Sequence, residues 1–267
     1  MPISKIVKKH ELDKFYTKTE VAKICIEKLV PYISDQVLIE PSAGNGAFSK
    51  QIECRAYDVA PDDPSIIKQD YLKSPALVGE VCVFGNPPFG RRNDLCKAFI
   101  KHSLGVRTIA FILPCVFEKS TYQKTFPPEW FLVENLELPK NSFLLNNTEY
   151  HVPCVFQIWI KDWTGNNLRK PIINRISTDD FTIVGKNEKS DLFVFGAAPN
   201  KFIHPTQVNE KNRGYYLAIT PGSVEDVKHN LSRIDWKNFG KSSVNGGVFW
   251  LTKTEFIEAY EQGKILC

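Results

Sequence analysis

The sequence predicts a doubly wound α/β domain followed by a small α+β domain. Between residue 18 and about 160, short apolar runs alternate with stretches of helical periodicity. A loop containing two glycines follows an apolar run in the segment 37–48, and two consecutive prolines end another apolar run at 87–88. Strands joined by helical crossovers form a parallel sheet covered on both faces, so we expect a seven-stranded, mostly parallel sheet.

The elements of this first domain follow from local patterns. A helix is predicted to begin at Thr19, because apolar residues then recur at helical spacing; they are Val21, Ile24, Cys25 and Leu29. Further helices are expected directly after the glycine loop, at Asn93–Ser103 and at Phe117–Thr125. The strands are predicted at Gln36–Glu40, Arg55–Val59, Ile66–Asp70, Val81–Gly85, Arg107–Leu113, Glu134–Leu138 and Val152–Ile160.

The alternation stops after Trp163, in a segment rich in Gly and Asn. Beyond it we expect short strands and then two helices, at Phe181–Val184, Asp191–Phe195, Gly214–Ile219, Val224–Leu231 and Lys253–Gln262. The chain is therefore divided into a first domain of residues 1–164 and a second domain of residues 165–267.

Composition excludes several classes of protein. With 43% apolar and 24% charged residues, the chain is neither disordered nor collagen-like. We find no apolar run long enough for a membrane span or a signal peptide, so we expect an intracellular protein, in the cytoplasm or at the nucleoid or nucleus. Seven cysteines without a CxxC or Cys/His cluster indicate buried free thiols in a reducing compartment, and no metal site. The net charge of +4 is too small to indicate nucleic-acid binding by itself.

The first chemical signal is VLIEPSAGNGAF at residues 37–48. Glu40 ends the strand, and Gly44 and Gly46 allow the backbone to approach a ligand closely. The third glycine of the dinucleotide fingerprint is missing, which disfavours NAD. A tight strand-to-helix turn without a ligand explains the same residues.

Two further strand ends carry carboxylates. Asp58 lies 18 residues after Glu40, where ribose hydroxyls are usually held in such folds. Asp70 precedes Tyr71, and this pair suits an adenine ring, with the carboxylate accepting from its amino group and the aromatic ring stacking on its plane. Each is also explained as an ordinary polar strand end.

The strongest signal is the tetrapeptide Asn86-Pro87-Pro88-Phe89 after a buried strand. Two prolines cannot continue a sheet ladder, so the strand ends at the edge where α/β sheets bind ligands. Proline fixes its backbone and leaves its carbonyl group as a rigid acceptor, while Asn86 adds an amide oxygen and Phe89 a ring. These residues predict a pocket for a planar group that bears an NH2.

In this order the motifs resemble those of S-adenosylmethionine-dependent adenine-N6 methyltransferases of the gamma arrangement. KFYT (Lys14–Thr17), EPSAGNGAF, the acidic second strand, QDYL and NPPF follow one another, and the resemblance covers about residues 11–160. It implies a Rossmann-like catalytic domain at 1–164, a target-recognition domain at 165–267, and S-adenosylmethionine as cofactor. It implies that the methionine part of the cofactor is held by Phe15, Tyr16, Thr17, Glu40, Pro41, Ser42, Gly44 and Gly46, the ribose by Asp58, and the adenine by Asp70 and Tyr71.

The chain departs from the family at one place, because Lys18 stands where KFYT is usually followed by proline. The aromatic residue that stacks on the target base also stays open, with Phe143 and Tyr150 both candidates. Arg91 and Arg92, directly after the tetrapeptide, are expected to bind phosphates, although a solvated loop accounts for them equally. A base- or backbone-reading surface in the second domain is suggested by Lys201, Lys211, Arg213, Phe202, Tyr215 and Tyr216.

Together, these expectations predict an enzyme that methylates the N6 amino group of adenine. The Asn86 side chain and the Pro87 carbonyl group would accept its hydrogens, Pro88 would hold the turn and Phe89 would stack on the base. DNA is favoured as the substrate, as in restriction-modification or orphan enzymes, and the base must be extruded or single-stranded. The same reaction on RNA, N5 methylation of a protein glutamine, and a non-catalytic scaffold are the alternatives. No metal, no membrane and no particular oligomeric state are implied.

Overall fold

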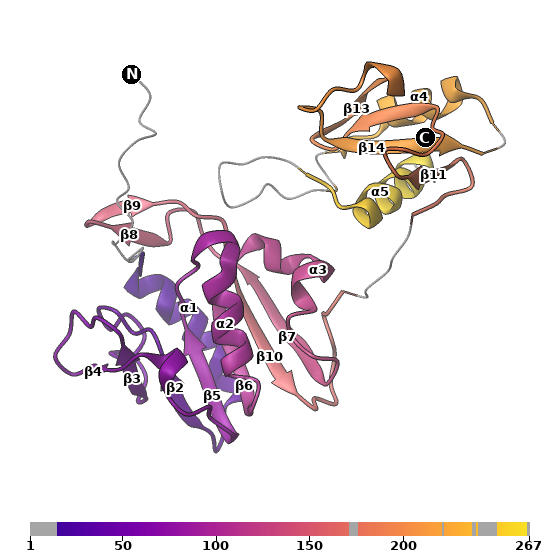
Figure 1. Ribbon diagram of the computed structural model, residues 1–267. Helices are drawn as coiled ribbons and strands as arrows, with labels where there is room; N and C mark the ends of the chain where they lie inside the picture. The colour runs from indigo at the N-terminus through magenta and orange to yellow at the C-terminus, as the bar shows by residue number, and fades with distance from the viewer. Residues whose placement is uncertain (1–14, 171–175, 221, 237–238, 240–249, 266–267) are drawn as a thin grey trace. The chain divides into compact units, whose positions relative to one another are not determined.

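The computed structural model describes residues 15–170, 176–220, 222–236, 239 and 250–265. The chain divides into two compact units, Met1–Pro171 and Ile172–Cys267, which Figure 1 shows and which are described separately below. Chain beyond the expected boundary at 164/165 still belongs to the first unit. Leu168 donates its backbone N–H to the carbonyl oxygen of Leu132, and the Arg169 side chain donates to four carbonyl groups of that unit.

A seven-stranded sheet forms the centre of the first unit, as expected. Parallel pairing joins β3 to β4, β2 to β3, β5 to β2 and β6 to β5, whereas β10 runs antiparallel to both β6 and β7. The sheet is therefore mostly parallel with one reversed strand, and the predicted fold class is confirmed. The strands lie in the order β4 (Ile67–Lys68), β3 (Arg55–Asp58), β2 (Val37–Glu40), β5 (Gly79–Gly85), β6 (Val106–Pro114), β10 (Cys154–Lys161) and β7 (Trp130–Glu137).

The sheet lies between two helices, with α2 (Asp94–His102) in front of it and α1 (Thr19–Leu29) behind it in Figure 1. Cys96, Phe99 and Ile100 of α2 join the main core cluster. The buried side of α1 includes Val21, Cys25 and Leu29, whereas Ile24, which shares their helical spacing in the sequence, is 37% exposed. Val21, Cys25 and Leu29 form the apolar stripe that faces the sheet. Ile24 lies at the edge of this stripe, so its side chain is turned away from the sheet.

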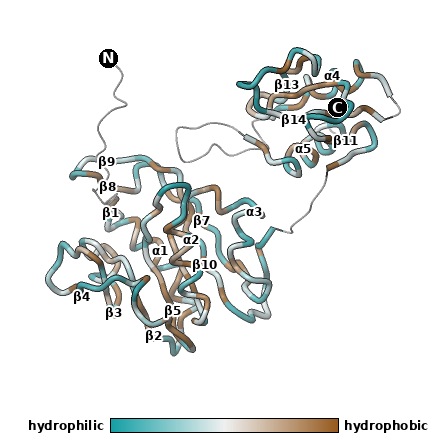
Figure 2. Tube along the Cα trace, in the orientation of Figure 1, coloured by the Kyte–Doolittle hydropathy of each residue, from teal (hydrophilic) through white to brown (hydrophobic). Residues whose placement is uncertain are grey.

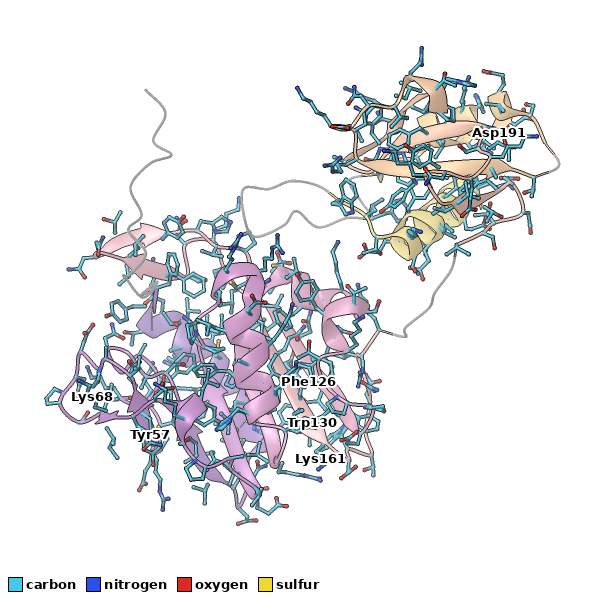
Figure 3. The ribbon with its side chains drawn as sticks, viewed as in Figure 1. Tyr57, Lys68, Phe126, Trp130, Lys161 and Asp191 are labelled. Carbon is cyan, nitrogen blue, oxygen red and sulfur yellow. The ribbon has the colours of Figure 1, made fainter. Side chains whose placement is uncertain are left out.

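The central strands carry the most apolar residues, as the brown colouring in Figure 2 shows. In β10 every residue from Cys154 to Ile160 is buried. The rings of Phe126 and Trp159 stack with centroids 3.9 Å apart, and Phe126 also packs against Trp130 (Figure 3). This packing fixes the end of the sheet that is remote from β4.

Two predicted helices of the first unit are wrong. Residues 41–52 form a succession of turns, because Gly44 and Gly46 adopt positive φ angles of 55° and 83° that interrupt a helix. The helix expected at Phe117–Thr125 is divided into a 3₁₀ segment, Cys115–Glu118, and the short helix α3, Ser120–Gln123. The extended backbone of Lys119, with ψ of 138°, separates them.

A hairpin that the sequence did not predict follows β7. Its strands β8 (Phe143–Leu145) and β9 (Thr148–Tyr150) are joined by Asn146 and Asn147, both with positive φ. Two successive positive φ angles are those of a type I′ turn, which asparagine tolerates well. The hairpin also pairs with β1 (Tyr16–Thr17), so the three strands form a small sheet in the order β1-β8-β9.

The second unit is an antiparallel four-stranded sheet with two helices on one face, α4 (Val224–Arg233) and α5 (Lys253–Ile265). The helix α4 begins where the sequence predicts it, since Ser223 caps it by accepting from the N–H of Asp226 over 3.0 Å. One strand, β13, was missed because it contains a proline and an asparagine. The strand order is β11 (Phe181–Val184), β14 (Gly214–Ile219), β12 (Leu192–Phe195) and β13 (Ala198–Ile203).

Candidate active site

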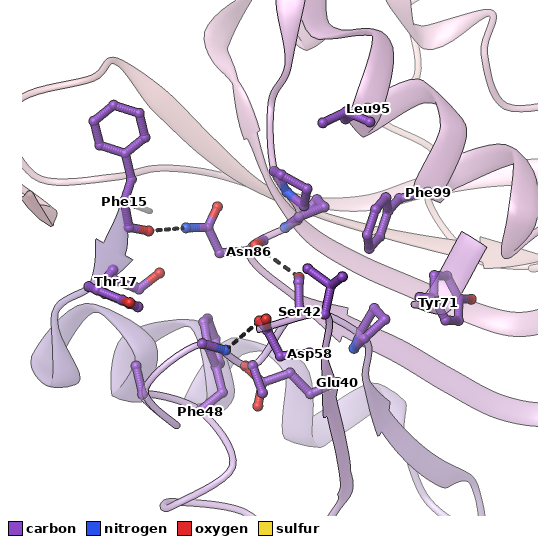
Figure 4. A pocket seen from close by; sticks show the side chains of 18 of the residues that line it. Phe15, Thr17, Glu40, Ser42, Phe48, Asp58, Tyr71, Asn86, Leu95 and Phe99 are labelled. Atoms are coloured by element: carbon purple, nitrogen blue, oxygen red, sulfur yellow. Dashed lines mark hydrogen bonds between the residues drawn. The ribbon is translucent and has the colours of Figure 1, made fainter. Parts of the chain in front are cut away.

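A pocket of about 300 Å³ opens at the carboxyl ends of the neighbouring strands β3, β2 and β5, where open α/β sheets bind ligands. Figure 4 shows how side chains from β1, the glycine loop, these strand ends and α2 converge on it. Of the residues that sequence reasoning assigned to the cofactor, all except Gly46 line it. The four residues of the NPPF tetrapeptide also line it, whereas Arg91, Arg92, Phe143 and Tyr150 do not.

Asp58 and the glycine loop form the floor of the pocket together. The Oδ2 atom of Asp58 accepts from the N–H of Gly44 and its Oδ1 atom from that of Ala60, both over 2.8 Å. Gly44 has a φ of 55°, and a Cβ there would lie 3.0 Å from the ring of Tyr16. Glycine at this position therefore leaves the loop close to both Tyr16 and Asp58.

Glu40, at the end of β2, is 1% exposed. Its Oε2 atom accepts a hydrogen bond of 3.1 Å from the N–H of Ser49. Burial raises the pKa of the Glu40 carboxyl group to about 8, and the charge of Asp58 acts in the same direction. The neutral acid therefore predominates at pH 7, and it can donate a hydrogen bond into the pocket as well as accept one.

The pair Asp70 and Tyr71 lies at the pocket wall in a different local structure from the one expected. Tyr71 begins a 3₁₀ helix, Tyr71–Lys73, which Asp70 caps by accepting from the N–H of Leu72. Hydrogen bonding and ion pairing with Lys73 lower the pKa of Asp70. Only 3% of Tyr71 is exposed, because its ring packs on Phe99 with centroids 5.4 Å apart, so little ring surface is left for a ligand.

Asn86 occupies the centre of the pocket rim. Its Nδ2 atom donates to the carbonyl oxygen of Phe15 over 3.2 Å, while the hydroxyl group of Ser42 donates to the Asn86 carbonyl oxygen over 3.0 Å. The Oδ1 atom is buried and has no hydrogen-bond partner among the described residues. A buried acceptor without a donor is costly, so a ligand that brings an N–H to Asn86 is favoured.

Two aromatic side chains of the pocket, Phe15 and Phe89, pack against rings of the hairpin. The ring of Phe89 meets that of Phe143 edge to face, with centroids 6.4 Å apart. Phe143 is fully buried, whereas Tyr150 is 44% exposed and stacks on Phe15 with centroids 5.2 Å apart. Of the two candidates for stacking on a base, Tyr150 is thus the one with open ring surface.

Arg91 and Arg92 are exposed and lie in a 3₁₀ segment, Arg91–Asn93, between the pocket and α2. Both Arg92 and Asn93 have positive φ angles, of 55° and 62°. Backbone strain of this kind is often retained next to functional sites. The two arginines stay beside the pocket and do not enter it.

Sequence reasoning missed several apolar residues of the pocket, among them Phe48, Leu95 and Phe99. The signal for Leu95 and Phe99 was their position on the helix that directly follows NPPF, because the first turns of such a helix lie beside the strand ends. Phe48 packs on Phe84 of β5 with centroids 6.0 Å apart, a contact between segments far apart in the sequence.

The pocket fits S-adenosylmethionine, which the motif resemblance implies. The cofactor has hydroxyl and ammonium donors as well as an apolar edge. Thr17 Oγ1 is a buried acceptor without a partner among the described residues, and Asp58 retains acceptor sites. Apolar side chains such as Leu72 and Phe99 also line the pocket. Within the residues that the structure describes, no group of His, Cys, Asp and Glu is arranged to hold a metal ion.

No protein-family model and no curated protein matches the sequence. Among solved structures, the chain is similar to an RNA methyltransferase candidate from Pyrococcus horikoshii, at 15% identity over 59% of this chain and 92% of the other, with a TM-score of 0.43. It is also similar to the M protein of the type I restriction enzyme EcoKI, at 14% identity over 61% of this chain and 46% of the other, with a TM-score of 0.42.

The 23S rRNA methyltransferase ErmE is a third similar structure, at 12% identity over 93% of this chain and 99% of the other, with a TM-score of 0.38. Methyltransferases thus stand among the solved structures that are similar to this chain, which has a Rossmann-like sheet. In the described part of the chain, no helix is long and apolar enough to cross a membrane.

Proposed function

We propose that this protein transfers a methyl group from S-adenosylmethionine to the N6 amino group of an adenine in nucleic acid, with DNA favoured over RNA. The observation that carries the proposal is the buried, unpartnered Oδ1 atom of Asn86 beside a pocket suited to the cofactor. The hydrogen bond to Phe15 holds the Asn86 amide group in this orientation, which leaves the Oδ1 acceptor for a ligand. An NH2 group matches this acceptor.

Cofactor binding is assigned to residues that the structure gathers around the pocket. Asp58 would accept from the ribose hydroxyl groups, and Asp70 from the adenine amino group of the cofactor. Phe15, Tyr16, Thr17 and the loop from Glu40 to Gly44 would surround its methionine part, while Gly46 shapes the loop. When bound, S-adenosylmethionine supplies an electrophilic methyl group.

The target amino group is activated by position and by hydrogen bonding. The lone pair of adenine N6 is delocalised into the ring and is a weak nucleophile. Asn86 Oδ1 and the carbonyl oxygen of Pro87 would accept its two hydrogens, which favours a pyramidal nitrogen with its lone pair directed out of the ring plane. Phe89 and Tyr150 would fix the base by stacking, and Pro88 would keep the turn rigid. The proton is then lost to water.

We assign target selection to the second unit, Ile172–Cys267. On the sheet face turned away from α4 and α5, the buried ring of Phe193 contacts those of Phe195 and Tyr216, with centroids 5.4 and 4.9 Å apart. Phe195 and Tyr216 are only partly buried, so their rings would offer the surface for a ligand. Aromatic rings on a sheet are a common platform for unpaired bases. Of the six residues suggested from sequence, Phe202 and Tyr215 instead pack into the core under the helices, and Tyr216 lies on the platform face.

A methylation assay separates this proposal from its alternatives. The protein is incubated with radiolabelled S-adenosylmethionine and duplex DNA, single-stranded DNA, RNA or a glutamine-containing peptide. We expect label in DNA, loss of label in Asn86→Ala, and full activity in Asn187→Ala, which changes an exposed asparagine outside the pocket. Label in RNA alone would show that RNA, and not DNA, is the substrate. Label in the peptide alone would exclude a nucleic-acid substrate. Tight cofactor binding without label in any substrate would favour a non-catalytic scaffold.

A further inference from the structure

Lys18 makes a backbone hydrogen bond that the usual proline of this motif cannot make. Its φ of −65° is one that proline also adopts, so the backbone conformation alone does not require lysine. However, the N–H of Lys18 donates to the carbonyl oxygen of Ser142 over 3.0 Å, and proline has no N–H. The substitution therefore adds a bond between the start of α1 and the base of the β8–β9 hairpin.

The Lys18 side chain extends this connection to the outer strand of the hairpin. Its Nζ atom pairs with Glu149 Oε1, and the second carboxylate oxygen of Glu149 accepts from Asn141 Nδ2 over 3.2 Å. The Lys18 side chain is only 17% exposed, so this pair is less screened by water than a fully exposed one. A second carboxylate, that of Glu20, lies 3.9 Å from Lys18 Nζ and is 69% exposed.

The two parts joined by Lys18 serve different ligands in the proposed reaction. Phe15, Tyr16 and Thr17 line the cofactor pocket, and β1 pairs Thr17 with Phe143 of the hairpin. Tyr150, the exposed aromatic residue of β9, stacks on Phe15. A hairpin with strands of three residues has little stability of its own, so its position depends on these attachments.

We infer that Lys18 is a positioning residue that couples the cofactor pocket to the hairpin carrying Tyr150. A ligand packed against residues 15–17 orders β1, and Lys18 transmits that order to the hairpin before the target base arrives. Because coupling between two sites is reciprocal, a bound target also strengthens cofactor binding. This inference rests on the proposed function, since it names how the same site prepares its second substrate.

Hydrogen exchange of the intact chain tests the coupling without any nucleic acid. The readout is the exchange rate of the peptide 141–151 with and without S-adenosylhomocysteine, whose affinity is measured in parallel by calorimetry. In the wild type we expect the ligand to slow exchange of this peptide. In Lys18→Met, the factor by which the ligand slows exchange should be about twofold to fivefold smaller, a range typical of a partly exposed ion pair. Lys18→Pro, which removes the N–H as well, loses more.

Three controls distinguish coupling from a general structural defect. Glu20→Gln, which changes the more distant carboxylate, keeps the wild-type protection. The exchanged pair Lys18→Glu with Glu149→Lys restores it, and high salt reduces it in the wild type but not in Lys18→Met. Full protection in folded Lys18→Met, or no recovery in the exchanged pair, overturns the inference. Absence of S-adenosylhomocysteine binding to the wild type overturns the proposed function instead.

Discussion

The side chain of Asn86 donates from Nδ2 to the carbonyl oxygen of Phe15 over 3.2 Å, and this hydrogen bond decides which end of the amide group faces the pocket. A carbonyl oxygen can only accept, so the NH2 end of Asn86 must point to Phe15 and the Oδ1 end away from it. Phe15, which precedes β1 and lines the pocket, thereby sets the orientation of the acceptor for the target amino group.

Replacement of Asn86 tests this acceptor directly. Asn86→Ala removes the oxygen, and we expect a loss of methylation rate of about 100-fold or more, as for other groups that stabilise developing charge. Affinity for S-adenosylhomocysteine should change little, because the alanine removes no group that we assign to the cofactor. Single-turnover rates and calorimetry measure the two effects. An unchanged rate in a folded variant contradicts the assigned role.

Tyr150 and Phe143 should respond to alanine in opposite ways. Tyr150→Ala removes an exposed ring, so we expect about 10- to 100-fold weaker binding of an oligonucleotide, which corresponds to about 1–3 kcal/mol of stacking, with unchanged thermal stability. Tyr150→Phe keeps the ring and the affinity. Phe143→Ala creates a cavity at a fully buried site and should lower the free energy of unfolding by about 3–5 kcal/mol. Fluorescence anisotropy and urea unfolding distinguish these outcomes.

Asp58 should matter more for the cofactor than Asp70. Asp58→Ala removes the assigned ribose acceptor and also the partner of the Gly44 N–H, so S-adenosylhomocysteine should bind about 10- to 100-fold more weakly, as expected for hydrogen bonds to a charged group. Asp70→Asn should have a smaller effect, because the amide keeps an oxygen that can accept from the adenine amino group. Isothermal titration calorimetry of both variants gives the comparison. An equal loss in the two contradicts the ranking.

The buried carboxyl group of Glu40 makes stability depend on pH. Its folded pKa is about 8, above the ordinary value of 4.5, so between these values the folded state binds more protons than the unfolded state. The contribution of Glu40 is therefore fully present below pH 4.5 and is lost as pH rises towards and through 8. In urea unfolding, Glu40→Gln should reduce the fall in stability across this window, whereas Glu27→Gln, an exposed control on α1, should not.

The sequence predicted the sheet and most of the pocket because both depend on local patterns. The apolar runs set the strands, and the residues at their carboxyl ends, Glu40, Asp58 and Asn86, meet at one edge in any parallel sheet. Alternation of strand and helix fixed the fold class for the same reason.

What the sequence did not predict depends on contacts between distant segments. Tyr71 is enclosed by Phe99 of α2, and no pattern near residue 71 indicates that contact. The hairpin was missed although Asn146 and Asn147 carry a turn signal, because its strands are short and all three residues of β9 are exposed, so no buried apolar run marks it. The choice between Phe143 and Tyr150 likewise required the pairing of β8 with β1, which buries one ring and leaves the other open.

Arg169 has a practical consequence for separating the two units. Its guanidinium group donates to the carbonyl oxygens of Gln123, Phe126, Pro127 and Trp130, and so holds the turn that leads into β7. A polypeptide cut at residue 164, where the composition changes, would lose the Arg169 donor, and the oxygens of Gln123 and Pro127 would keep only their backbone donors. A polypeptide that ends after Lys170 keeps all four hydrogen bonds of Arg169. A fragment of the first unit that retains these bonds must therefore extend past the boundary visible in the sequence.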